Sequence, residues 1–263
     1  MDIIPALIFL ISDFLLKCPV QQGLLKPNYE RHLEFLIKRL DITEKDNRMN
    51  LDQARFFMVE QQIRPWDVLD PKILDLLMDT PRHLFVEKGN EGLAYSDIEL
   101  PLGEGQAMMF PRVEGRLLQA LDIDAEEKVL EIGTGSGYLT ALMAKLGHSV
   151  DSVELHPAIQ TAAKPRLNNF DNITFHTGDA SIDWNDGQEY DVIVLTGSVK
   201  DIPQAYKEKL TLGGRLGVIA GEAPAMTAQV LTRISNQEWE VETLFETDLT
   251  PLSNKNETNG FTF

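Results

Sequence analysis

Apolar positions in the middle of the chain follow two patterns that alternate with each other. Short, nearly unbroken apolar runs predict buried strands, and they cover residues 128–132, 149–154, 173–177, 191–196 and 215–220. Segments with helical spacing lie between several of these runs, for example at residues 138–146. Because strands that alternate with helices are typical of βαβ units, the pattern predicts an α/β fold with a doubly wound, mostly parallel sheet.

The segments on either side of this region follow other patterns. Residues 229–234 and 239–244 are strand-like and enclose a polar turn, which predicts an antiparallel hairpin that extends the sheet. Helices are expected N-terminal to the sheet at residues 51–62, 71–78 and 113–121. Residues 101–111 contain Gly and Pro at several positions and predict a loop.

The first 48 residues differ from the rest of the chain. Residues 3–16 are mostly apolar, but a proline and two polar residues interrupt a run that is shorter than the roughly 20 residues of a spanning helix. No basic residue precedes the run, as it would in a signal peptide. We therefore expect an N-terminal extension at 1–48 and one domain at 49–263.

Three interpretations of that extension stay open. It is an upstream translation artefact before a start at Met49, a membrane-associating segment, or an accessory helix packed on the domain. None of the three predicts stable membrane insertion.

Composition and charge narrow the classes of function. The chain has 263 residues, 43% of them hydrophobic and 25% charged, which is ordinary for a globular protein. Its one cysteine, Cys18, excludes an intrachain disulfide and suits a reducing compartment. Lys/Arg and Asp/Glu balance within residues 1–48, so the remaining residues carry the whole net charge of −17. Such an acidic surface repels phosphate backbones, so a nucleic-acid partner is not expected.

The strongest local motif is glycine-rich and spans residues 129–138 (VLEIGTGSGY). Gly133, Gly135 and Gly137 directly follow an apolar strand and precede a helix. Glycines at this position let a ligand approach the backbone and leave the N–H groups of the next helix accessible. The motif therefore predicts a nucleotide-like cofactor on this loop, which we call the glycine loop (residues 133–137).

Two residues favour S-adenosylmethionine over a dinucleotide. The dinucleotide fingerprint requires a glycine where this chain has Tyr138. Glu131, two residues before the first glycine, would repel a pyrophosphate but suits a ligand with an ammonium and a sulfonium group. We therefore expect S-adenosylmethionine as the cofactor.

Further cofactor contacts are expected at the ends of the other strands, because ligands of open α/β sheets bind there. Glu154 ends the second strand, where a carboxylate can accept both hydrogen bonds of a ribose diol. Asp179 and Ala180 follow the third strand, where Asp179 can meet the adenine amine. Thr196 and Tyr138 lie at strand–helix junctions beside the expected cofactor.

Several segments together resemble the protein-L-isoaspartate O-methyltransferase family, in its order and spacing. They are residues 80–86 (TPRHLFV), 100–106 (LPLGEGQ), 129–138, 213–216 (GGRL) and 247–252 (TDLTPL). The resemblance covers about residues 49–252 and implies a Rossmann-like, S-adenosylmethionine-dependent methyltransferase fold. It also implies a cytoplasmic protein-repair enzyme that methylates the α-carboxylate of L-isoaspartyl residues in damaged proteins or peptides.

One loop departs from the pattern of that family. After Gly-Gln the family continues Thr-Ile-Ser-Gln-Pro, with the serine in its active site. In this chain Gln106 is followed by Ala107, Met108, Met109, Phe110 and Pro111, so Met109 stands at the position of the serine. The usual histidine between the two glycines is Glu104. We call residues 105–111 the acceptor loop and take Gln106 and Met109 as its candidate catalytic positions.

Three consequences of this departure stay open: an altered substrate site, lost catalysis, or neutral drift. Met108, Met109 and Phe110 can form an apolar lip over the cofactor or simply pack in the core. A carboxylate with a pKa of roughly 4 is already ionised at pH 7, so its methylation needs no general base. Positioning alone can lower the barrier by about 7–11 kcal/mol.

Other residues carry little chemistry. The five histidines show no metal-like clustering, so no metal site is expected, and His83 is expected to pack rather than to catalyse. The alternatives to isoaspartyl repair are methylation of another small-molecule or protein acceptor and a non-catalytic S-adenosylmethionine-binding protein. The pattern does not indicate an oligomeric state.

Overall fold

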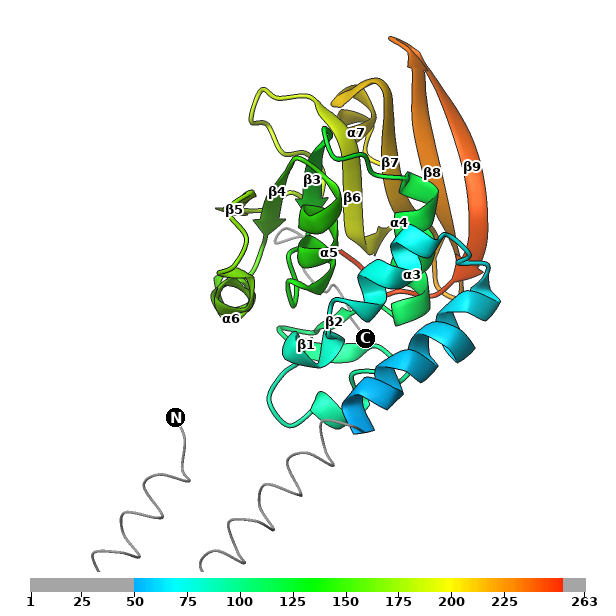
Figure 1. Cartoon of the computed structure of the whole chain (residues 1–263). Coiled ribbons are helices and arrows are strands. Elements are labelled where there is room, and N and C mark those ends of the chain that lie inside the picture. Colours follow the sequence, from blue (N-terminus) through cyan, green and yellow to red (C-terminus); the bar gives the residue numbers. More distant parts are fainter. Residues whose placement is uncertain (1–49, 253–263) are drawn as a thin grey trace, which may run out of the picture. The chain divides into compact units, whose positions relative to one another are not determined.

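The computed structural model describes residues 50–252, and a seven-stranded sheet forms its centre (Figure 1). The strands are β3 (Lys128–Ile132), β4 (Ser149–Glu154), β5 (Ile173–Thr177), β6 (Tyr190–Val199), β7 (Leu210–Glu222), β8 (Ala225–Ser235) and β9 (Glu238–Thr247). Their order is β5-β4-β3-β6-β7-β8-β9. The pairs from β5 to β7 are parallel and the last two are antiparallel, which confirms the predicted fold class. The expected extension at 1–48 lies outside the described residues.

The strands form because their apolar side chains are covered on both faces of the sheet. Val129 of β3 packs in a core cluster with α4 and α5, whereas its neighbour Leu130 packs in a second cluster on the opposite face. A parallel sheet covered on both faces accommodates continuous apolar runs. The strands β6 and β7 extend beyond their apolar runs. Pairing of β6 continues to Val199, and β7 pairs from Leu210, opposite Tyr190 of β6, to Glu222, opposite Ala225 of β8.

Five α-helices between residues 71 and 208 pack around this sheet. They are α3 (Pro71–Met78), α4 (Pro111–Leu121), α5 (Tyr138–Leu146), α6 (Pro157–Ala163) and α7 (Gln204–Glu208). The α3 helix begins where expected, because the Asp70 side chain accepts a hydrogen bond from the Lys72 N–H (2.8 Å) and Pro71 occupies the first turn. The helix expected at 51–62 is α-helical through residue 57 and continues as a π-helix, η1 (Met58–Ile63).

The expectation of a plain loop at residues 101–111 is wrong. The strands β1 (Leu100–Gly103) and β2 (Gln106–Met108) pair antiparallel there. Glu104 and Gly105 connect them, both with positive φ (52° and 74°), as a type I′ turn requires. A glutamate rarely adopts this conformation, so the local sequence did not indicate a tight hairpin.

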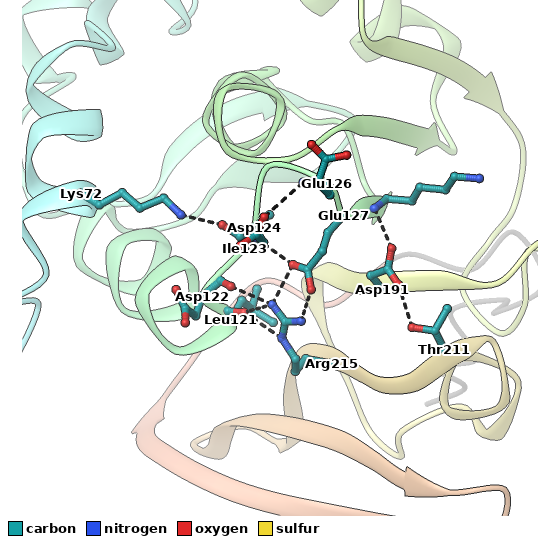
Figure 2. A network of polar contacts seen from close by, with 11 residues as sticks. Lys72, Leu121, Asp122, Ile123, Asp124, Glu126, Glu127, Asp191, Thr211 and Arg215 are labelled. Atoms are coloured by element: carbon teal, nitrogen blue, oxygen red, sulfur yellow. Dashed lines mark hydrogen bonds and ion pairs between the residues drawn. The ribbon is translucent and has the colours of Figure 1, made fainter.

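A polar network lies at the amino ends of the strands (Figure 2). Arg215 of β7 donates to the Leu121 and Asp122 carbonyls and to the Glu127 carboxylate, using all three guanidinium nitrogens. Beside it, Asp191 accepts hydrogen bonds from the Lys128 N–H (2.9 Å) and the Thr211 hydroxyl (2.8 Å). These contacts join the beginnings of β3, β6 and β7 to the end of α4. Within residues 50–252, no helix is both long enough and apolar enough to cross a membrane.

Candidate active site

An open cavity with about 600 Å³ of empty space lies at the carboxyl ends of the central strands. Four strands contribute to its lining: Gly133 follows β3, Glu154 ends β4, Gly178 follows β5, and Thr196 lies in the last part of β6. The chain passes from β3 to β4 and β5 on one side and to β6 on the other, so the strand order reverses at this point. Such a reversal opens a crevice for ligands in doubly wound sheets. We call this space the larger cavity.

The glycine loop fits against β6 because Gly133 has no side chain. Gly133 has φ +99°, and a Cβ there would lie 2.2 Å from the Thr196 hydroxyl oxygen. That hydroxyl donates to the carbonyls of Ile132 (2.9 Å) and Gly133 (2.7 Å). Thr196 therefore holds the loop in place while it lines the larger cavity.

Glu154 fastens the other side of the same loop. Its Oε2 accepts a hydrogen bond from the Gly135 N–H (2.9 Å), and its Oε1 accepts one from the His156 N–H (3.0 Å). Each carboxylate oxygen can accept a further hydrogen bond. Glu154 is buried yet lines the larger cavity, so it is placed to accept hydroxyl groups of a ligand.

Glu131 is completely buried and faces a smaller cavity of about 290 Å³. Its Oε2 accepts hydrogen bonds from the hydroxyls of Ser152 (2.5 Å) and Thr140 (2.6 Å). Its Oε1 has no hydrogen-bond partner within residues 50–252. Burial raises the pKa of this carboxyl to about 8. A buried oxygen of this kind normally has a partner, so it marks a place for a donor or a cation.

The two cavities are neighbours. Both are lined by the same five residues: Leu102, Ala107, Gly133, Gly135 and Thr196. A ligand on the glycine loop therefore lies beside both cavities.

The other residues expected to bind the cofactor divide into two groups. Ala180 lines the larger cavity together with Ser181. Asp179 lines neither cavity, and its carboxylate accepts hydrogen bonds from the Ser181 N–H (3.1 Å) and hydroxyl (2.7 Å). Gly137 and Tyr138 also line neither cavity. Tyr138 is buried in the core behind the glycine loop, against the ring of Phe85.

The acceptor loop contributes to both cavities. Gln106 lines the larger cavity, and Met108 and Met109 line the smaller one. Both methionines are only 4% exposed, so they pack in the core and form a wall of the smaller cavity at the same time. Phe110 lies beneath the guanidinium of Arg112 and lines neither cavity.

The sequence did not indicate a buried ion pair next to this loop. Arg82, in the TPRHLFV segment, pairs with Glu114 of α4, and its Nη2 donates to the Met109 carbonyl (2.6 Å). Glu114 lines the smaller cavity, and burial raises its pKa to about 7. The one available signal was an acidic residue on the apolar face of α4, next to Val113.

The segment at residues 248–252, which we call the C-terminal strap, forms part of the wall of the larger cavity. Leu249, Thr250 and Leu252 line it. Ser198 of β6 holds the strap: its hydroxyl donates to the Leu249 carbonyl (2.8 Å), and its carbonyl accepts from the Leu252 N–H (2.8 Å). A Cβ on Gly197 would lie 2.7 Å from the Leu252 nitrogen, so the strap requires glycine beneath it.

Residues 55–257 match the family model of protein-L-isoaspartate(D-aspartate) O-methyltransferase. The chain is 39% identical over 185 residues to the protein-L-isoaspartate O-methyltransferase of Syntrophus aciditrophicus, covering 70% of this chain and 85% of the relative. It is 38% identical over 192 residues to that of Geobacter metallireducens, covering 72% and 88%.

The fold is similar to a solved Plasmodium falciparum structure named for the same enzyme and holding S-adenosyl-L-homocysteine. The TM-score is 0.66 at 18% identity, covering 76% of this chain and 98% of that one.

Proposed function

Because the chain belongs to the protein-L-isoaspartate O-methyltransferase family, we propose that it transfers a methyl group from S-adenosylmethionine to the α-carboxylate of L-isoaspartyl residues in proteins or peptides. The observation that carries the proposal is the pair of adjoining cavities. Residues of the glycine loop and of the acceptor loop line both cavities. Such a site allows a donor and an acceptor to be bound next to each other.

The described residues fit S-adenosylmethionine. The partnerless Oε1 of Glu131 suits an ammonium group, and the spare acceptor capacity of Glu154 suits a ribose diol. Ala180 and Asp179 are proposed for the adenine end, although only Ala180 lines the larger cavity. When bound, S-adenosylmethionine supplies an electrophilic methyl group on its sulfonium.

The chain itself has to hold the acceptor rather than activate it. An acceptor carboxylate is ionised at neutral pH and needs no base. Gln106 and the backbone of the acceptor loop are placed to aim it, whereas Met109 offers no hydroxyl and contributes an apolar wall. The C-terminal strap adds Leu249 and Leu252, two apolar side chains, to the lining of the larger cavity.

We further infer a cytoplasmic enzyme without a nucleic-acid partner, because its net charge is −17 and its single cysteine suits a reducing compartment. The domain at 49–263 is proposed to hold the whole site, since all the residues named above lie within it.

The test is transfer of a tritiated methyl group to an isoaspartyl peptide, to its normal aspartyl twin and to a pool of small molecules from cell extract. We expect labelling of the isoaspartyl peptide above its twin. Labelling of the small molecules alone would show a different acceptor. Donor binding without any labelling would show a non-catalytic binding protein.

A further inference from the structure

Arg82 is completely buried on a short 3-10 helix, η3 (Arg82–Leu84), and it contacts three other elements. A buried guanidinium is costly unless charges and acceptors compensate it. Its Nη1 is paired with the carboxylate of Glu114 on α4, and its Nη2 donates to the Met109 carbonyl of the acceptor loop at 2.6 Å. Its Cζ lies 4.9 Å from the ring centroid of Tyr138.

These contacts link the two loops that must meet in the reaction. Tyr138 is the first residue of α5 and directly follows the glycine loop. Met109 stands in the acceptor loop and lines the smaller cavity. One side chain therefore contacts both the backbone of the acceptor loop and the ring of the residue that follows the glycine loop.

We propose that Arg82 is a positioning residue that holds the acceptor loop in register with the glycine loop for methyl transfer. This inference rests on the proposed function. Because Arg82 donates its hydrogen bond to the backbone carbonyl of Met109, this contact does not depend on which side chain stands at position 109. Misplacement of reacting groups by 1 Å can slow a reaction about 100-fold, so the effect is expected in the rate and not in donor binding.

The test removes this Arg82 contact without leaving a buried charge. Arg82→Met combined with Glu114→Leu deletes both charges, and such replacements are often neutral for stability. We expect the dissociation constant of S-adenosylmethionine to change less than about threefold and kcat for an isoaspartyl peptide to fall at least about tenfold. Amide exchange at residues 107–110 should accelerate, while exchange in β3 stays slow. Arg82→Lys keeps the positive charge but loses the planar guanidinium that donates to two acceptors at once, so it should give an intermediate kcat.

A matched control lies at the far end of the sheet. Lys209 pairs with Asp186 at 2.6 Å and donates to the Gln188 carbonyl (3.2 Å), which is the same arrangement away from both cavities. Lys209→Met with Asp186→Asn should change thermal stability and leave kcat and the exchange of residues 107–110 unaltered.

Several outcomes would overturn the proposal. An unchanged kcat, unchanged exchange in the acceptor loop, or a parallel loss of donor affinity and rate would each exclude a positioning role. If the unaltered chain does not label the isoaspartyl peptide, the proposed function fails, and amide exchange alone then decides whether Arg82 holds the loop.

Discussion

At the amino ends of the strands, Arg215 donates from all three of its guanidinium nitrogens, and Asp191 accepts two hydrogen bonds (Figure 2). At the carboxyl ends of the same sheet, Glu131 keeps one buried oxygen without a partner in the described part of the chain. The first arrangement joins elements to one another, and neither Arg215 nor Asp191 lines a cavity. At the carboxyl ends, Glu154 holds the glycine loop in place, and the unpaired oxygen of Glu131 can still accept a hydrogen bond from a ligand. Stability and binding are therefore separated along the strands, and four predictions test that separation.

The largest loss of stability is expected from a substitution at the amino ends of the strands. Arg215→Met leaves the Glu127 carboxylate and the carbonyls of Leu121 and Asp122 without this donor, and should lower the free energy of unfolding by about 2–4 kcal/mol. Donor affinity should not change, because Arg215 lines neither cavity. Chemical denaturation and calorimetric titration measure the two quantities. A large loss of donor affinity would show that the two ends are not independent.

Glu131→Gln should have opposite effects on stability and on binding. The folded-state pKa of Glu131 is raised to about 8, so the folded chain keeps a proton that the unfolded chain loses above the ordinary pKa of 4.5. Stability of the ligand-free protein therefore falls as the pH rises through this window. The glutamine side chain does not titrate, so the variant does not lose stability in this pH window. Its free energy of unfolding should therefore exceed that of the unaltered chain increasingly between pH 5 and 8, by on the order of 2–4 kcal/mol.

The same substitution removes the negative charge expected to meet the ammonium of S-adenosylmethionine. Affinity should fall by about 1.5–3 kcal/mol, as for a hydrogen bond to a charged group. Thermal melts across pH and calorimetry are the measurements. Equal stability of both proteins at pH 8, or unchanged affinity, would contradict this account of Glu131.

A gain of activity is expected when the acceptor loop regains its hydroxyls. Met109→Ser with Ala107→Thr should raise methylation of an isoaspartyl peptide about tenfold, because one hydrogen bond to a carboxylate contributes about 1.5–3 kcal/mol and 1.36 kcal/mol corresponds to a factor of ten. Donor affinity should hardly change. A fast rate in the unaltered chain without any gain would show that backbone groups near Gln106 aim the acceptor. Activity that stays at background would indicate a different acceptor.

The smallest effect is expected from removing the extension. A chain that begins at Met49 should bind S-adenosylmethionine as tightly as the full chain and melt at a similar temperature. All proposed contacts lie after residue 48, and Leu51 already packs against the core. Aggregation of the shorter chain or loss of donor binding would show that the extension belongs to the fold.

Features with a local physical cause were predictable from the sequence. The expected bounds of β3, β4 and β5 agree with the structure. The apolar runs of β3 and β4 are mostly buried, as in strands that are covered on both faces, whereas β5 lies at the edge of the sheet. The glycine loop was predictable because its glycines follow a strand directly. Gly133, Glu154 and Thr196 were all expected at the cofactor and all line the larger cavity.

Features that depend on distant contacts were not predictable. Arg82 and Glu114 are 32 residues apart, and no periodicity connects them. The strap meets Ser198 of β6 only after the chain has completed three further strands. Asp179 follows its strand as expected but turns to Ser181, because a short carboxylate side chain readily bonds to backbone N–H groups two residues on. The position of Asp179 directly after β5 did not indicate that its carboxylate bonds to Ser181 and does not line the larger cavity.

The position of β9 at the margin of the sheet has a consequence for how copies of this chain behave together. An edge strand exposes unpaired N–H and C=O groups, which can template pairing with another molecule. Glu238, Glu240, Glu242 and Glu246 are exposed along β9. Two such edges brought side by side would place rows of like charges within about 5 Å of each other. Charge repulsion between these glutamates therefore disfavours pairing of two β9 edges and keeps copies of the chain apart. The glutamates have this effect although they lie outside both cavities.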